Sequence, residues 1–520
     1  MCRDFSFVQH SEPMGTIRTA SGRIAEAADT EPASRVDHGV ARPDALGWPN
    51  SSKPDIRTIF IVVSARVVAA TTPVRTRPVS GTRGEICVTY RLTDIDCVSA
   101  RGHSALGGTL AIQAVWRYDR PVDLAALEHF HEALRHGRLG RAAAPAMIPA
   151  AGDRWTTRAE FSPLEIADEP IPSGALEAWI AEQGHAELRT FGGPAWRLAA
   201  TRLDNGESAV SLLVSHTLAD GHAFCAAVTD AVADKRLDLA YPSDEFGRLR
   251  LLAGDLRDAA RRARSFPSAA GLALRLSVAR RGGAGPGDNG RDFHLPTVTA
   301  TVPAQQWHAA ARARGGTGTT LAVAMMAAIA TEIGRTDEEG RVRMMMPVST
   351  RTADDLRANA LTSIAFELDA RGGEPVDLAP LRAVMKEKLT AAAASGQDVP
   401  PLVPVAVALP RGRYARLARQ AATDPISTVC SSLGKLDPEI LRIDGRPASA
   451  MMLGLVNQSL NSRTVVTERG GNLYVALIEA ADAITLRIMG FHPPTLLDAE
   501  RLTELVQAAL AEYELSATFW

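Results

Sequence analysis

One stretch, Ser208–Asp230, constrains the fold more than any other because its hydrophobic period changes in the middle. Its first part, Val210–Val214, is a short apolar run with the length of one buried strand. After a short polar turn, Phe224, Val228 and Val232 recur every four residues, as they would on one face of a helix. The stretch therefore predicts a strand, a turn and a helix in succession.

The turn carries the side chain with the most chemical potential, His216, at the end of the predicted strand. An imidazole has an ordinary pKa of about 6.5, so at neutral pH it can accept a proton. Asp220 can anchor the turn from behind, and we expect Gly221 to supply backbone angles that a side chain would resist. A structural histidine bound to a backbone carbonyl fits the same pattern, so these residues alone leave both roles open.

Composition excludes several classes of function. The chain has 57 basic and 59 acidic residues and a net charge of −2, which favours neither nucleic acid nor bulk attraction to an anionic membrane as a partner. Its five scattered cysteines form no CxxC pair, so we expect no metal site and no disulfide framework. No apolar run reaches about 18 residues, and no signal peptide is evident. We expect a cytoplasmic protein, peripheral to a membrane or lipid surface at most.

The chain divides into two halves of similar size. Residues 1–84 are predicted to be a flexible N-terminal extension, and the glycine-rich segment 282–294 is predicted to link an N-terminal lobe, 85–281, to a C-terminal lobe, 295–520. Strands are predicted at Thr109–Tyr118, Trp196–Thr201, Ala209–Val214, Thr297–Val302, Val342–Val348, Leu361–Leu368, Val429–Leu436, Leu473–Glu479 and Ile484–Phe491. Helices are predicted at Leu124–Leu134, Ser173–Glu187 with Ser173 as its cap, Ala304–Arg314, Leu321–Ile333 and Leu496–Tyr513. This mixture indicates an α/β protein.

Two further segments have more than one interpretation. The basic run Arg257–Arg264 (RDAARRAR) is typical of a solvated helix face, with phosphate or membrane binding as the alternative. Gly315–Thr320 (GGTGTT) lacks the GK[ST] ending of a phosphate-binding loop, so an ordinary N-cap at Thr317, Thr319 or Thr320 is favoured.

The residues His216-Thr217-Leu218-Ala219-Asp220-Gly221 resemble the HxxxDG signature of one acyltransferase superfamily. It contains nonribosomal-peptide condensation domains, wax ester synthase/diacylglycerol acyltransferases, polyketide-associated acyltransferases and chloramphenicol acetyltransferase. Further matches follow in the superfamily's order. Pro194–Arg197 (PAWR) resembles the PLWR element, and Gly315–Arg335 resembles the helix that opens the second half. Met346–Arg351 (MPVSTR) resembles VPVSLR, Asn359 stands at the asparagine of a GN pair, and Ser431–Gly434 (SSLG) resembles SNLG. The departures are Ser215 for the first of two histidines, Ala358 for the glycine before Asn359, and Ser432 for the asparagine of SNLG.

The resemblance implies two chloramphenicol-acetyltransferase-like lobes, each a mixed β-sheet with flanking helices, and an active-site tunnel between them. It makes His216 the general base, Asp220 and Arg351 a structural ion pair, and Gly221 the residue that allows the bend. Four more residues are assigned to the tunnel: Ser215, Asn359, Ser432 and Gly434. Because neighbours on a strand point to opposite faces, Ser215 is not expected to be a nucleophile, and no covalent acyl-enzyme is expected. His222, one residue beyond the motif, is predicted to face the helix surface.

The resemblance also indicates the partners. It implies no cofactor and an acyl thioester donor, acyl-CoA in our primary interpretation, with an alcohol as acceptor. One alternative is an amide-forming condensation enzyme that takes an amine acceptor and uses substrates bound to a free-standing acyl carrier protein. Another is a degenerate, non-catalytic protein that binds thioesters or partners. The two-lobe architecture is expected to work as a monomer.

Overall fold

The computed structural model describes residues 90–239, 241, 247–264, 293–352, 355–369, 377–395, 403–421 and 427–520. The predicted extension, 1–84, and most of the predicted linker, 282–292, lie outside these residues. Among the helices of the described ranges, none combines the length and the apolar character needed to cross a bilayer.

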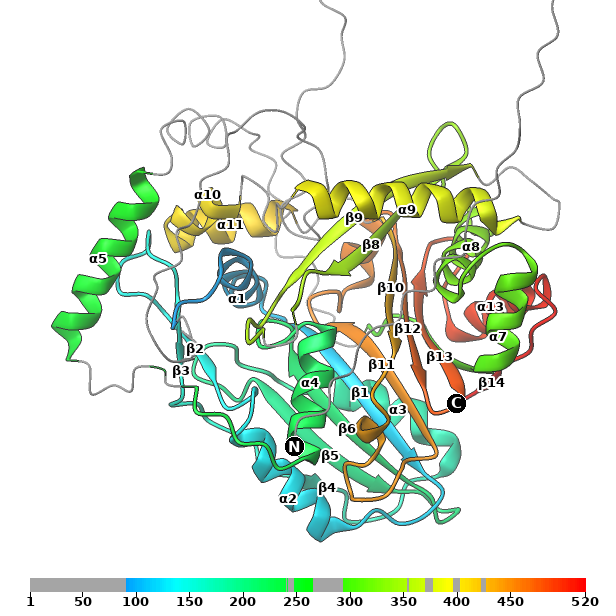
Figure 1. Ribbon diagram of the computed structural model, residues 1–520, viewed down its shortest axis with the longest axis horizontal. Helices are drawn as coiled ribbons and strands as arrows, with labels where there is room; N and C mark the ends of the chain where they lie inside the picture. The colour runs from blue at the N-terminus through cyan, green and yellow to red at the C-terminus, as the bar shows by residue number, and fades with distance from the viewer. Residues whose placement is uncertain are drawn as a thin grey trace, which may run out of the picture. The chain divides into compact units, whose positions relative to one another are not determined.

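Two mixed sheets with flanking helices form the molecule, which confirms the predicted α/β class (Figure 1). The strands of the first sheet are, in spatial order, β11 (Ala450–Asn457), β1 (Leu110–Tyr118), β6 (Ser208–Ser215), β5 (Trp196–Arg202) and β4 (Glu165–Ile166). Those of the second are β14 (Thr518–Phe519), β7 (Thr297–Pro303), β13 (Ala483–Phe491), β12 (Asn472–Ala480), β10 (Thr428–Lys435), β8 (Arg341–Ser349) and β9 (Leu361–Asp369). A small hairpin joins β2 (Ala142–Ala144) to β3 (Arg154–Thr156).

The helices of the first half of the chain are α1 (Asp94–Leu106), α2 (Leu124–Arg135), α3 (Leu176–Gly184), α4 (Gly221–Val232) and α5 (Arg248–Arg264). Those of the second half are α7 (Ala304–Ala313), α8 (Gly318–Glu332), α9 (Leu378–Ser395), α10 (Val403–Ala408), α11 (Arg411–Ala421), α12 (Arg463–Glu468) and α13 (Ala499–Ala511), and two 3-10 turns are η2 (Ser173–Ala175) and η3 (Pro438–Leu441). In Figure 1, α7, α8 and α13 pack against the second sheet, while α10 and α11 pack against α1.

A strand from the second half of the chain completes the first sheet. β11 pairs antiparallel with β1 along its whole length, from Leu110 opposite Asn457 to Arg117 opposite Ala450. Sequence analysis did not assign this strand, whose partner lies more than 300 residues earlier in the chain. Gly454 at its centre allows Arg487 of β13 to approach closely, since a Cβ there would lie 2.7 Å from the Arg487 Cγ. The two sheets are thus in direct contact.

Each sheet has its own buried core. The first core gathers around the fully buried Trp116 and Trp196 and also takes in Tyr414 of α11, from the second half of the chain. The second core surrounds Trp307 and the almost wholly buried inner face of α8. Burial of this much apolar surface is the main stabilising contribution to a chain of this size.

Two predicted helix starts, Ser173 and Leu496, are wrong, since α13 begins only at Ala499 and Leu496 forms a β-bridge with His492. The helix expected from Ser173 opens as the 3-10 turn η2, and α3 begins only at Leu176. Ser173 does not cap α3, because Ala175 precedes that helix and no side chain caps it. The Ser173 backbone N–H instead donates to Asp204 at 2.9 Å, which holds this residue outside the helix. At α8, by contrast, Thr317 is the N-cap and forms a capping box with Thr320, as the N-cap prediction for this loop required.

Candidate functional site

The predicted strand, turn and helix around His216 are confirmed. β6 is buried throughout and ends at Ser215, a turn holds His216, and α4 begins at Gly221. The backbone N–H of His216 donates to the carbonyl of Leu110 on β1 at 2.8 Å, so the residue remains attached to the sheet although the strand has ended. The imidazole is therefore mounted on a rigid sheet rather than on a long loop.

Asp220 is the N-cap of α4 and joins the two halves of the site. One carboxylate oxygen accepts from the backbone N–H of Ala223 at 2.8 Å, which satisfies the helix terminus. The other accepts from the Arg351 guanidinium at 2.8 Å and from the backbone N–H of Ala360 at 2.7 Å. The ion pair that the resemblance implied between Asp220 and Arg351 is thus present, and both side chains are nearly buried.

Arg351 also shapes the loop that connects β8 to β9. Its guanidinium donates to the backbone carbonyls of Asp355, Arg357 and Ala358 at 2.9–3.1 Å. A planar guanidinium with five donors suits such a cluster of acceptors, which a lysine could not match. The Arg351 guanidinium therefore both fixes this loop and binds the carboxylate of Asp220 at the start of α4.

Asn359, at the end of this loop, holds the backbone of His216. Its side-chain amide donates to the His216 carbonyl at 2.9 Å and to the Asp96 carboxylate at 2.8 Å, and the residue is buried. Asp96 belongs to α1 and is completely buried, and this burial raises its pKa to about 6 although the bonds from Asn359 and Thr93 oppose the rise. The asparagine therefore links the motif, α1 and the second sheet.

The electrostatic environment of His216 keeps its ring neutral. Burial lowers its pKa from the ordinary value, while the charge of Asp220 and hydrogen bonds of the ring with the residue's own backbone and with the Asn359 side chain act in the opposite direction. A neutral imidazole keeps one nitrogen lone pair that can accept a proton.

A second histidine, which sequence analysis missed, supports this turn. His103 of α1 accepts from the backbone N–H of Leu110 through Nε2 at 3.1 Å, so its Nδ1 donates to the Thr217 hydroxyl at 3.3 Å. The hydroxyls of Thr217 and Ser99 are 2.9 Å apart. Burial, followed by the charge of His216, lowers the pKa of His103 to about 3. His103 is thus a neutral positioning residue for the segment that follows His216.

The remaining predicted site residues lie in two environments. Ser215 is fully buried, and its hydroxyl lies 3.3 Å from that of Thr190. Ser432 and Gly434 of β10 line a cavity of about 530 Å³ beside the N-terminus of α8, where the Ser432 hydroxyl lies 3.2 Å from that of Thr319. His222 is exposed, as predicted.

The expected reason for Gly221 is wrong. Its backbone is not in the left-handed region, so it does not supply a conformation closed to other residues. The glycine is required by a close approach instead: a Cβ at this position would lie 2.5 Å from a methyl carbon of Leu433 on β10. Leu433 of the second sheet thus packs directly on the start of α4.

Replacing Gly221 with alanine is therefore expected to push Leu433 aside and to lower the free energy of unfolding by about 1–2 kcal/mol. Urea unfolding of Gly221→Ala, Leu433→Ala and the double variant would measure this. In the double variant the two losses should be less than additive, because the second substitution removes the clash. Strict additivity would show that the contact does not matter.

The comparisons with known proteins find similarity in structure and no match in sequence. No family model matches the chain, and no curated protein matches it in sequence. Among solved structures, the chain is similar to the nonribosomal peptide synthetase FmoA3, with 18% identity over 85% of this chain and a TM-score of 0.49. It spans 45% of the FmoA3 chain.

Two shorter proteins are matched over nearly their whole length. The first condensation domain of the CDA synthetase shares 14% identity, with 84% of this chain and all of that domain covered and a TM-score of 0.49. The wax ester synthase/diacylglycerol acyltransferase from Marinobacter aquaeolei VT8 shares 15% identity, with 82% and 98% covered and a TM-score of 0.48. Condensation domains and wax ester synthase/diacylglycerol acyltransferase are the kinds of protein to which this chain is similar in structure, as its motifs are in sequence.

Proposed function

We propose that the protein transfers an acyl group from a thioester, with acyl-CoA as the donor, to an alcohol. The observation that carries this proposal is the setting of His216: an imidazole whose pKa is lowered by burial, placed at the end of β6 and held through its backbone carbonyl by Asn359. A base for this reaction needs a pKa close to or below the working pH and a fixed direction. The lowered pKa of His216 and the attachment of its backbone to Leu110 and Asn359 support this role.

In the proposed reaction the imidazole of His216 takes the proton of the acceptor hydroxyl as its oxygen attacks the thioester carbonyl. The new carbon–oxygen bond forms, the carbon–sulfur bond breaks, and the imidazolium returns its proton to the departing thiolate. Such general-base assistance contributes about 10²–10⁴-fold to a rate. Ser215 is fully buried, which supports direct transfer without an acyl-serine.

The pairing of the second sheet supports a route by which the donor reaches His216. Within the described residues, β10 pairs with β8 only at Thr428 and Val429, whereas its pairing with β12 continues to Lys435. The strands β8 and β10 therefore separate beyond these residues. Both sides of the opening contact the motif, since Arg351 follows β8 and Leu433 lies on β10. We propose that the thioester arm passes here.

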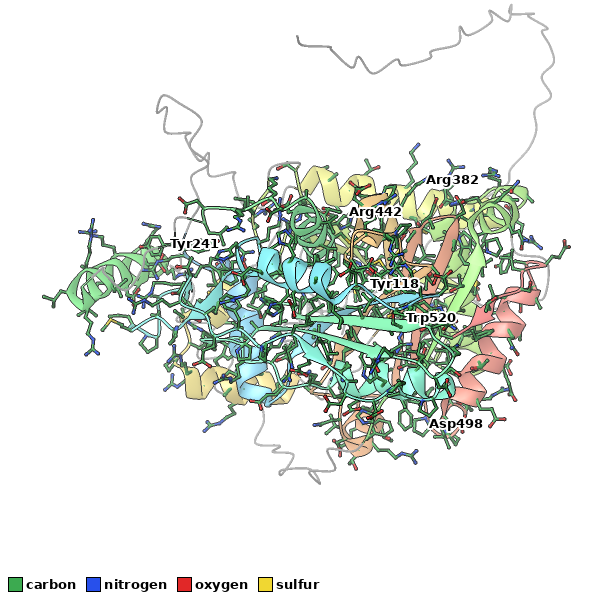
Figure 2. The ribbon with its side chains drawn as sticks, turned by 90° about the horizontal axis from the view of Figure 1, so that it is seen from below. Tyr118, Tyr241, Arg382, Arg442, Asp498 and Trp520 are labelled. Atoms are coloured by element: carbon green, nitrogen blue, oxygen red, sulfur yellow. The ribbon has the colours of Figure 1, made fainter. Side chains whose placement is uncertain are left out.

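The cavity beside α8 supports a donor that carries phosphate. It is lined by the N-terminus of α8, by Ser432, by three basic side chains, His308, Arg312 and Arg382, and by Glu479, whose carboxylate lies 2.9 Å from the His308 ring. Both arginines are exposed, and Figure 2 shows Arg382 at the surface. Helix N-termini and guanidinium groups are favourable partners of phosphate. A pantetheine thioester would place its phosphate groups here and its acyl group toward His216.

The direct test is the release of free thiol by purified protein supplied with a panel of acyl-CoAs and either alcohols or amines. We expect release that depends on an alcohol and that exceeds the rate with amines of the same chain length. Release that requires an amine and a carrier-bound donor would favour the amide-forming alternative. If no acceptor raised thiol release above background, the protein would be a binding protein rather than an enzyme.

The cavity provides a second arm of the same test. Arg312→Gln with Arg382→Gln is expected to raise the KM for acyl-CoA by about tenfold or more, because charge-assisted contacts to phosphate are lost. Turnover of an acyl N-acetylcysteamine thioester, which has no phosphate, should not change. Arg343→Gln, which alters an exposed arginine of β8 outside the cavity, is the matched control.

A further inference from the structure

Helix α5 packs against the protein through its charged side. Asp255 is fully buried and accepts from the guanidinium groups of Arg91 and Arg154 at 2.8–3.1 Å and from the backbone N–H of Met147 at 2.7 Å. Moving a buried carboxylate away from this many hydrogen-bond donors is energetically costly, because its charge would lose its partners. The carboxylate therefore fixes how α5 is rotated about its own axis.

A second set of polar contacts, one turn further along, fixes the same rotation. Asp258 accepts from the backbone N–H of Gly152 and from the Arg262 side chain, each at 2.9 Å. Arg262 in turn donates to Asp94 at the start of α1 at 2.6 Å. Both acidic residues of α5 thus point inward, where Asp255 is paired with arginines of other elements and Asp258 with Arg262 of the same helix and the backbone N–H of Gly152.

The outward side of α5 is consequently apolar and basic. Leu249 and Leu256 lie seven residues apart on one helix face and are 83% and 54% exposed, the two highest values among the large hydrophobic residues described as exposed. Three more exposed residues of this helix are arginines, Arg248, Arg250 and Arg257, and Arg261 follows one turn later. No acidic side chain is exposed on α5 in the described residues. In Figure 1, α5 is the green helix at the left edge of the ribbon.

An ordinary surface helix has the opposite arrangement, with leucines inward and charges toward water. In α5 the inward ion pairs instead leave Leu249 and Leu256 exposed to water, where their side chains do not stabilise the fold. A stripe of leucine flanked by arginine suits the boundary between the acyl chains and the headgroups of a bilayer that contains anionic lipid. The chain as a whole has a net charge of −2, so this attraction is local to α5.

We propose that the outward face of α5, defined by Leu249, Leu256 and the arginines beside them, docks the protein onto an anionic phospholipid surface. The leucines enter the interface and the guanidinium groups bind lipid phosphate. This surface is separate from the cavity and from His216, so the proposal stands or falls independently of the proposed acyl transfer.

The experiment is co-sedimentation of the full chain with vesicles made of phosphatidylcholine and phosphatidylglycerol in equal amounts, and with vesicles of phosphatidylcholine alone. We expect binding to the anionic vesicles that weakens with added salt, and far weaker binding to the neutral ones. Leu249→Ser with Leu256→Ser should lower the partition coefficient by about tenfold or more. Arg248→Gln with Arg257→Gln should lower it and reduce its dependence on salt.

The matched control is Leu124→Ser with Leu497→Ser, which removes two leucines that are 43% and 39% exposed on other elements and should bind as the wild type does. Because all four leucines are exposed, circular dichroism should show every variant folded. Equal binding to neutral vesicles, or undiminished binding by the α5 leucine variant, would overturn the proposal. So would a lipid-free dimer that the α5 leucine variant dissociates, since the face would then bind a second copy.

Discussion

Replacing His216 with alanine is expected to lower kcat/KM for thioester turnover by about 10²–10⁴-fold while the protein stays folded. In the proposed reaction the imidazole accepts the proton, whereas the side chains of Asn359 and Asp220 bind backbone groups of His216 and Ala360. At about 1.4 kcal/mol for each factor of ten, the loss corresponds to about 3–5 kcal/mol of barrier height. Steady-state release of free thiol from the best acyl-CoA measures it.

His222→Ala is the matched control. This second histidine lies one residue beyond the motif on the same helix but is exposed, so its loss should leave kcat/KM unchanged. Thermal unfolding of both variants would show whether either change disturbs the fold. Equal turnover by wild type and His216→Ala would contradict the assignment and give the motif a structural role alone.

The pH profile of the wild type gives an independent readout of the same group. A protonated imidazole cannot accept a proton, so activity should be lost as the pH falls. The ordinary pKa of an imidazole is about 6.5. Because burial lowers the pKa of His216, the acid limb of kcat/KM should lie below this value. An acid limb above that value would assign the titration to another group.

The sequence predicts those features of the site whose residues lie close together in the chain. The strand, the turn and the helix around His216 follow from hydrophobic spacing within some 20 residues, and they are confirmed. The partnership of Asp220 with Arg351 spans 131 positions and was predicted only through the motif resemblance. β11 is an apolar run of strand length that was not assigned, and no motif placed it beside β1.

The residues that support His216 show the same limit. Asn359 is predicted from the resemblance to line a tunnel. In the structure its side-chain amide donates to the His216 carbonyl, a contact that the sequence does not indicate. His103 and Asp96 lie on α1, more than 100 residues before the motif, and no spacing in the sequence connects them with it. Gly221 was singled out correctly but for the wrong physical reason, because its neighbour Leu433 is distant in sequence.

The largest expected effect on stability comes from separating Asp220 and Arg351. Asp220→Ala removes the cap of α4, the acceptor for the Ala360 N–H and the partner of a guanidinium that is only 10% exposed. Leaving one partner of a buried pair uncompensated costs about 3–5 kcal/mol, so we expect a loss of that size in the free energy of unfolding, measured with urea. Arg351→Ala should cost less, because Asp220 keeps two backbone donors.

A double-mutant cycle separates the pair from the other contacts of each residue. Asp220→Ala with Arg351→Ala should lose less than the sum of the single variants, by about 1–3 kcal/mol, because the second substitution removes the unpaired charge. The exposed pair of Arg189 and Glu160, 2.6 Å apart, is the matched control, and Glu160→Ala should cost about 1 kcal/mol or less. Equal costs for the two pairs would show that the inter-sheet contact is no stronger than a surface ion pair.

The same variants separate the structural role from the chemical one. If Asp220 only fixes the turn, then Asp220→Asn, whose remaining amide oxygen can still cap α4, should lose stability while the acid limb of its pH profile moves only slightly downward. The direction follows because the charge of Asp220 raises the pKa of His216, and removing that charge leaves burial as the dominant influence. An acid limb that disappeared altogether would instead place Asp220 in the proton transfer itself, since no change in positioning abolishes the titration of a histidine that is still present.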